Sequence, residues 1–169
     1  MPAPPKQRKI AIVGSRSVGM RSKTAQSITA LFKLHHGAAG LVYRIHLDEY
    51  SILNSKHFIG IHGYMIVYSV ASRQSFDMVT VIREKILNHL GADWVPLVIV
   101  GNKSDLKPDQ RQVSLEEGRQ LGEQFHCAFT EASARLDYNV AKAFDLMIGE
   151  IEKSQNPSQP TGGSKCAVM

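Results

Sequence analysis

Two glycines near the start of the chain have the spacing of a phosphate-binding loop. The apolar run 10–13 leads into Gly14, and Gly19 follows after four residues. Glycines there let backbone N–H groups wrap around phosphates, and the N-terminus of a following helix favours an anion. Such a loop continues with Lys and then Ser or Thr, but Met20 and Arg21 stand at those places. By itself the glycine pair is a weak signal, because an ordinary strand–helix turn explains it about as well.

A Lys-Thr pair does occur, three positions late, at Lys23 and Thr24. Three residues along a helix place Lys23 on nearly the same face, about 4.5 Å further on, so its ammonium could reach back only part of the way. Thr24 is too short to do so, and Arg21 supplies charge without a compact ammonium contact. The alternative is that all three are surface residues of a helix.

A second candidate loop, Asn102 to Asp105, directly follows the stretch PLVIVG, residues 96–101. The Asp105 carboxylate could accept two N–H bonds from one edge of guanine. Adenine has an acceptor at that edge and would leave the charge unpaired, at a cost of about 1–3 kcal/mol. The Lys103 stem could lie across the base, and Asn102 could tie loops together. The alternative is a polar turn, since Asn, Ser and Asp are turn residues.

A third candidate loop contains Ser133 and Ala134 and follows another short apolar run. Small residues there let a backbone N–H approach the carbonyl oxygen of guanine. This loop alone is weak evidence, but each of the three loops follows a strand of its own. Along the chain, the first would bind phosphate, and the second and third, which we call the base loops (102–105 and 133–134), would bind the base. Together they favour a guanine-nucleotide site over three coincidental turns.

The last four residues, Cys166 to Met169, fit the C-a-a-X pattern, in which a terminal Met favours farnesylation of the cysteine. The polar stretch 155–165 has the composition of a flexible tail. A single lipid gives weak, reversible membrane binding, and Lys165 is the one nearby base. We expect a domain over residues 1–154 and a tail over 155–169.

These loops need parallel strands to position them, and the chain provides the pattern. Near-continuous apolar runs alternate with helical stripes, which predicts a doubly wound α/β domain with ligands at the carboxyl ends of the strands. The expected strands are 9–13, 41–47, 63–70, 96–100 and a short one near 128. The expected helices are 24–35, one capped by Ser72, one opened by a Ser114–Glu117 capping box, and a last one that contains Val140 to Ile151.

Composition restricts the class of protein. The 169 residues are 43% hydrophobic and 21% charged, as in one globular domain, and two cysteines make no disulfide framework. No run is long enough to span a bilayer, and no secretory signal is evident.

The charges are unevenly distributed along the chain. Eight bases and no acids lie in residues 1–47, which favours an anion site there. A transit peptide is also acid-poor, but the strand at residue 10 argues against one. Basic and aromatic residues do not interleave, so no nucleic acid is expected.

The motifs together resemble the Rheb family within the Ras superfamily of small GTPases. The resemblance covers residues 6–19 and 48–169 and is carried by GSRSVG, DEYSI, GYMIVYSV, SFDMV, VGNKSDL, EASAR and the terminal CAVM. It implies a P-loop, Ras-like fold. The nucleotide-binding residues it implies are Gly14, Arg16, Ser17, Val18, Gly19, Asn102, Lys103, Asp105, Ser133 and Ala134, with Cys166 as the lipidation site.

The resemblance also implies a function. It indicates a switch that binds GTP or GDP with Mg²⁺ and signals to the target-of-rapamycin kinase complex. It implies farnesyltransferase as a partner, and a cytoplasmic protein reversibly attached to the cytoplasmic face of endomembranes or the plasma membrane through farnesylated Cys166.

Residues 20–47 do not fit the family pattern. The loop Lys and Ser, the effector loop with its magnesium-binding Thr, the Asp-x-x-Gly motif and the water-positioning Gln have no counterparts. A helix, two strands and their loops need roughly 40–45 residues, but only 28 lie between Gly19 and Asp48. We therefore expect a sheet that lacks one edge strand, weakened triphosphate binding, little or no hydrolysis, and neither a catalytic residue nor a protein ligand for the metal.

Three interpretations remain open at this point. The chain is a Rheb-like switch, or a non-catalytic, lipid-anchored pseudo-GTPase, or a chain that does not fold stably because its shortened sheet exposes an edge. A mis-spliced or wrongly predicted exon over codons 20–47 would explain why the resemblance stops and restarts so abruptly.

Overall fold

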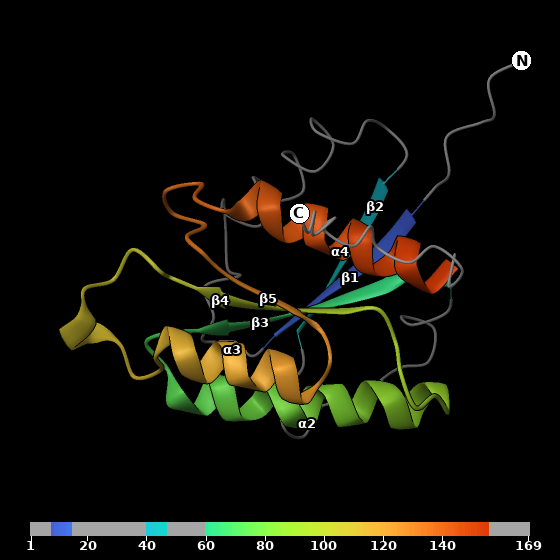
Figure 1. Ribbon diagram of the computed structural model, residues 1–169, viewed down its shortest axis with the longest axis horizontal. Coiled ribbons are helices and arrows are strands. Elements are labelled where there is room, and N and C mark those ends of the chain that lie inside the picture. The colour runs from blue at the N-terminus through green and yellow to red at the C-terminus, as the bar shows by residue number, and fades with distance from the viewer. Residues whose placement is uncertain (1–7, 15–39, 47–59, 156–169) are drawn as a thin grey trace, which may run out of the picture.

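The computed structural model describes residues 8–14, 40–46 and 60–155 of the chain, the second of these segments by its backbone. Figure 1 shows them as a sheet between two layers of helix. The strands are β1 (Arg8–Gly14), β2 (Gly40–His46), β3 (Gly63–Ser69), β4 (Leu97–Asn102) and β5 (Ala128–Ala132). The helices are α2 (Arg73–Leu90), the short 3₁₀ helix η4 (Pro108–Gln110), α3 (Leu115–Gln124) and α4 (Val140–Gln155).

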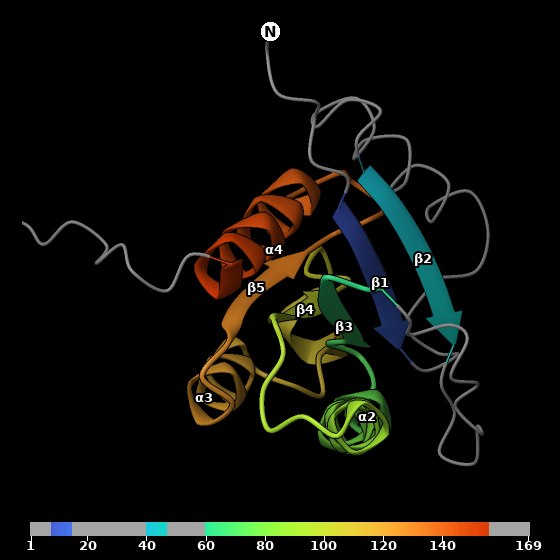
Figure 2. The same cartoon turned by 90° about the vertical axis from the view of Figure 1, so that its right-hand side faces the viewer.

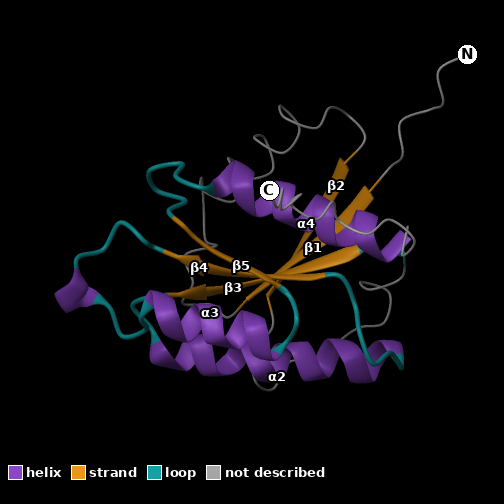
Figure 3. Ribbon diagram, in the orientation of Figure 1, coloured by secondary structure: helices purple, strands orange, loops and turns teal. Residues whose placement is uncertain are grey.

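The five strands run parallel in the order β2-β1-β3-β4-β5. Figure 3 draws them in orange between the purple helices. The order changes direction at β1, which pairs with β2 on one side and β3 on the other. Gly14 at the end of β1 lies opposite His46 of β2 and Val67 of β3. In an open parallel sheet, ligands bind outside the carboxyl ends of the strands near such a point. The fold thus brings Gly14 to the expected ligand edge.

Figure 2 shows α2 and α3 on one side of the sheet and α4 on the other. An apolar core lies under each of these two layers. In β1, Ala11 and Val13 belong to the core under α2, whereas Ile10 and Ile12 belong to the core under α4. Side chains of a strand alternate between its faces, so a strand covered on both faces must be apolar throughout. This is why the strands appear in the sequence as unbroken apolar runs.

Helix α3 packs closely against the sheet because position 118 has no side chain. A Cβ atom at Gly118 would lie 2.6 Å from the Tyr68 hydroxyl and 2.6 Å from Phe129 Cε2. Tyr68 and Phe129 belong to β3 and β5. The glycine therefore lets α3 lie close to β3 and β5.

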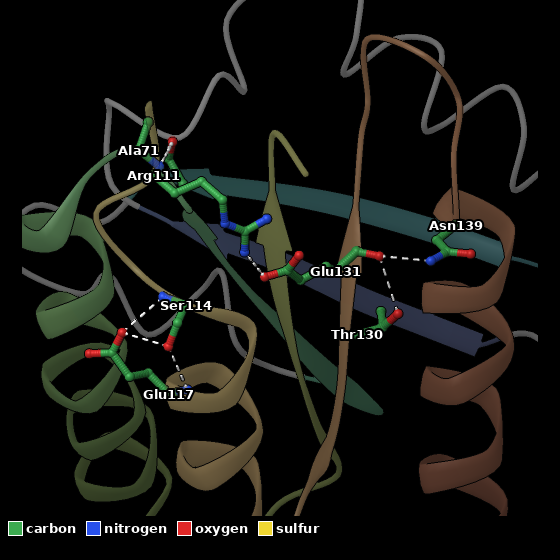
Figure 4. Close-up of polar contacts among 8 residues, drawn as sticks. Ala71, Arg111, Ser114, Glu117, Thr130, Glu131 and Asn139 are labelled. Atoms are coloured by element: carbon green, nitrogen blue, oxygen red, sulfur yellow. Dashed lines mark hydrogen bonds and ion pairs between the residues drawn. The ribbon is translucent and has the colours of Figure 1, made fainter. Parts of the chain in front are cut away.

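Side chains cap the starts of two helices as the sequence predicts. Ser72 accepts a hydrogen bond from the Ser75 N–H at α2. At α3 the Ser114 Oγ accepts from the Glu117 N–H at 3.2 Å, and the Glu117 carboxylate accepts from the Ser114 N–H at 2.8 Å. Figure 4 shows this reciprocal pair.

The capping box makes the stability of the domain depend on pH. The Ser114 N–H, helped by Arg73 and the Ser114 hydroxyl, lowers the pKa of Glu117 from 4.5 to about 2. The charged form is favoured in the folded state, so this stabilisation is present above pH 4.5 and disappears as the pH falls toward 2.

Glu117→Gln should therefore lower the free energy of unfolding by on the order of half a kcal/mol at pH 7, a small value because the side chain is partly exposed. In urea titrations the difference from wild type should vanish near pH 2; an unchanged difference there would contradict the assignment.

Most predicted elements coincide with observed ones. The strand expected at 41–47 is β2, the one expected at 96–100 begins and ends slightly later as β4, and the last helix begins at Val140. Between β1 and β3 the described residues contain the strand β2, which runs parallel to β1. The helix predicted over 24–35 lies outside the described residues.

Candidate functional site

The loop after β4 is shaped by its backbone. Asn102 is the last residue of β4, and Lys103 has a left-handed backbone with φ 68°. The Leu106 N–H donates to the Lys103 carbonyl at 3.1 Å, which closes a turn, and the Ser104 N–H donates to the Ala132 carbonyl at 3.1 Å. The loop is therefore anchored to the end of β5.

Asp105 and Ser133 meet across the two base loops. The Ser133 hydroxyl lies 2.6 Å from Asp105 Oδ1, and the Leu136 N–H donates to the same hydroxyl oxygen at 3.2 Å. Because that oxygen accepts from Leu136, its proton is free to go to Asp105. Ser133 is 1% exposed and the Asp105 side chain 11%. This pair holds the carboxylate in one orientation.

The second oxygen of Asp105 has a weaker neighbour. Arg135 Nη1 lies 3.9 Å from Asp105 Oδ2, and the Arg135 side chain is 83% exposed. An ion pair so exposed contributes little. Asp105 thus keeps acceptor capacity for a ligand's N–H groups. Its role in binding a guanine edge stays a prediction.

Asn102 joins three segments, as the sequence predicts. Its Oδ1 accepts from the Ala134 N–H at 3.1 Å. Its carbonyl accepts from the Val70 N–H at 3.0 Å, just beyond β3. The Ala134 N–H is therefore already used within the protein, and a guanine carbonyl oxygen would compete with Asn102 for it.

Sequence reasoning missed how the loop 133–139 is braced. Ser133 and Tyr138 exchange two backbone hydrogen bonds of 3.0 Å each, and Asp137 and Asn139 have left-handed backbones. The Asn139 Nδ2 donates to the Glu131 carbonyl at 3.0 Å. Asp and Asn tolerate positive φ better than other residues with a side chain. Asp137 and Asn139 were therefore the feature of the sequence that could have indicated this loop conformation.

The phosphate half of the candidate site is described only where it begins. Gly14 ends β1, between β2 and β3, and it is buried. The predicted residues Arg16, Ser17, Val18 and Gly19 lie outside the described residues, as does the lipidation candidate Cys166. Their roles stay predictions.

Metal-binding groups are missing from the part of the chain that the structure describes. No three His, Cys, Asp or Glu residues converge there on a position suitable for a metal ion. Among the same residues, no helix is both long and apolar enough to cross a bilayer.

A cavity of about 590 Å³ lies between α3, β5 and the start of α4. Asp105 and Ser133 border one end of it, but Asn102, Lys103 and Ala134 do not line it. It is therefore a groove beside the base loops. Cys127 also lines it, and burial raises the pKa of this thiol to about 12, so the thiol stays protonated and is a poor nucleophile.

Comparison with known proteins gives the family. The Ras family model matches residues 47–153. The small monomeric GTPase RhbA of Aspergillus fumigatus is 71% identical, with all of both chains covered. The chain belongs to the Rheb family of small GTPases. Two further family members are similar: GTP-binding protein rhb1 of Schizosaccharomyces pombe, 50% identical over 98% of this chain and 99% of its own, and human GTP-binding protein Rheb, 37% identical over 97% and 98%.

The same comparisons mark where this Rheb-family chain departs from its relatives. The Ras family match begins at residue 47, after the segment that does not fit the family pattern. The alignment with RhbA spans 187 positions, whereas this chain has 169 residues. RhbA therefore contains residues that have no counterpart here.

Proposed function

We propose that this chain is a Rheb-family protein that selects guanine nucleotides through its base loops but holds their phosphates weakly and hydrolyses GTP slowly or not at all. The observation that carries the proposal is the bonded set of Asp105, Ser133, Asn102 and Ala134. It joins two loops at the carboxyl edge of the sheet and holds in one orientation the Asp105 carboxylate, which we expect to bind the guanine edge.

Weak hydrolysis follows from what the sequence lacks. Phosphoryl transfer is mainly positioning and stabilisation of charge. The Lys and Ser after Gly19, the Asp-x-x-Gly motif and the water-positioning Gln are all missing from the chain. Mg²⁺ is expected for the family, but its usual protein ligands are among the missing groups.

Similarity to named relatives supports a role for this chain in signalling. Several relatives are named GTP-binding proteins. We place this chain with them in signalling to the target-of-rapamycin kinase complex. Farnesylation of Cys166 by farnesyltransferase would attach it reversibly to the cytoplasmic face of endomembranes or the plasma membrane, with a domain over 1–154 and a tail over 155–169.

A second candidate is a non-catalytic, lipid-anchored binding module that has lost nucleotide binding altogether. The shorter chain and the late start of the family match favour it. The same observations fit a mis-spliced product. Sequencing the transcript across codons 20–47 separates these cases, since a message that encodes Gly-Lys-Ser and Asp-x-x-Gly would show that the family site is complete in the cell.

Nucleotide titration tests the proposal directly. Fluorescent GDP, GTP and ADP are titrated into the full chain with and without Mg²⁺, and turnover of GTP is followed separately. We expect guanine nucleotides to bind more tightly than ADP, with little gain from Mg²⁺ and no measurable turnover. Tight binding that depends on Mg²⁺ would show an intact switch, and a folded chain that binds no guanine nucleotide would favour the binding module.

A further inference from the structure

An ion pair connects the segment after the Asp105 loop to the strand that leads into the Ser133 loop, and neither of its residues is among the predicted nucleotide-binding residues. Arg111 Nη2 pairs with Glu131 Oε1. Figure 4 shows the Arg111 guanidinium pointing toward the Glu131 carboxylate. Arg111 follows η4 in the segment after the Asp105 loop, and Glu131 is the residue before the last one of β5.

This ion pair is the most buried one in the described segments. The Arg111 and Glu131 side chains are 18% and 11% exposed, whereas those of Arg73 and Glu117 are 43% and 39% exposed. Charges removed from water lose hydration, so a buried pair often adds little net stability compared with apolar residues. What it does impose is geometry, because each charge must stay near the other.

Glu131 is tied to both base loops by its neighbours. Its carbonyl accepts from the Asn139 side chain at 3.0 Å. The next carbonyl, of Ala132, accepts from the Ser104 N–H at 3.1 Å. Two residues after Glu131 stands Ser133, whose hydroxyl contacts Asp105. A shift of Glu131 would therefore move partners of Asp105.

Backbone hydrogen bonds hold Arg111 and the two residues after it in place. Its N–H donates to the Pro108 carbonyl at 3.3 Å. The N–H groups of the two following residues, Gln112 and Val113, both donate to the Val70 carbonyl, at 2.8 and 3.1 Å. Val70 is the residue whose own N–H bonds to Asn102. The guanidinium is thus anchored to the end of β3 and reaches the end of β5.

We propose that the Arg111–Glu131 ion pair is a positioning element that keeps the two base loops at the separation at which Asp105 and Ser133 can recognise guanine. The inference rests on the proposed function, which it deepens by naming residues outside the predicted nucleotide-binding set. Hydrogen bonds weaken steeply with misalignment. A small displacement should therefore reduce the discrimination between bases more than it reduces the binding of the sugar and phosphates.

The test compares Arg111→Met with Arg8→Met, which breaks an Arg–Glu pair of the same chemistry, Arg8 with Glu152, at the start of β1. GDP and IDP are titrated into each full-length variant; IDP lacks the exocyclic amino group that would donate to Asp105. We expect Arg111→Met to lower the ratio of GDP to IDP affinity about tenfold, and Arg8→Met to leave it unchanged. An equal loss for both nucleotides in Arg111→Met would overturn the proposal, because a purely structural role predicts that result.

Two more conservative variants distinguish a loss of positioning from a loss of folding. Glu131→Gln removes the charge but keeps the size and the backbone bonds, and it should lower the same ratio. Arg111→Lys keeps a positive charge and should recover part of the ratio. A full loss in Arg111→Lys together with no loss in Glu131→Gln would contradict the proposal.

Amide hydrogen exchange makes the test independent of nucleotide. In the nucleotide-free chain, Arg111→Met should speed exchange in the loops 103–107 and 133–139 by about tenfold or more, while α2 stays protected. If the wild type binds no guanine nucleotide, the proposed function fails, and this measurement decides the inference alone. Exchange unchanged in both loops would then overturn it.

Discussion

Asp105→Ala should abolish the preference of this protein for guanine over adenine nucleotides. The wild-type carboxylate is held by Ser133 and keeps acceptor capacity for two N–H groups. Hydrogen bonds to a charged group contribute about 1.5–3 kcal/mol each, so losing two should weaken guanine binding by about a hundredfold or more. Adenine nucleotides should bind as weakly as before. Competition between GDP and ADP for one fluorescent guanine nucleotide measures both affinities.

Asp109→Ala is the matched control for this variant. Asp109 lies in the same segment, on η4, and is exposed. It should leave both the affinity and the preference unchanged. Removal of Asp105 also leaves the buried Ser133 hydroxyl without its carboxylate, so thermal unfolding of each variant must be measured alongside. A folded Asp105→Ala protein that still prefers GDP would show that guanine is read elsewhere.

The architecture could be predicted from the sequence because the signals were local. A strand covered on both faces must be apolar throughout, and β3, seven buried residues in a row, shows this pattern. The caps at Ser72 and Ser114 act over three residues, so their spacing in the sequence predicts the contact. Membership of the Rheb family followed from motifs at the ends of such strands.

The bracing of the site could not be predicted in the same way. Ser133 lies 28 positions from Asp105, and Arg111 lies 20 from Glu131. No periodicity connects residues so far apart; they meet because β4 and β5 are neighbours. Glu131 is the first residue of the EASAR motif, but no sequence pattern near Arg111 identified it as the partner of Glu131. The roles of Arg16 to Gly19 stay predictions, since that segment lies outside the described residues.

The double substitution Met20→Lys, Arg21→Ser should raise the affinity for GTP and GDP. It restores the G-x-x-x-x-G-K-S pattern, in which a compact ammonium meets the phosphates and a hydroxyl can join the metal site. Charge-assisted contacts to phosphate are roughly twice as strong as neutral ones, so we expect a gain of about tenfold or more. The gain should be larger for GDP than for GMP, which has no β-phosphate, and titration of the three nucleotides with Mg²⁺ measures it.

Met20→Ala, Arg21→Ala is the control, because it changes the same positions without adding a phosphate ligand; it should give no gain. GTP turnover should stay undetectable in the restored chain, since the Asp-x-x-Gly motif and the water-positioning Gln are still missing. Binding and hydrolysis would then be separated in one protein, the first limited by residues 20 and 21 and the second by groups the chain lacks. Turnover approaching that of a complete relative would contradict this division, and so would equal affinities in the two variants.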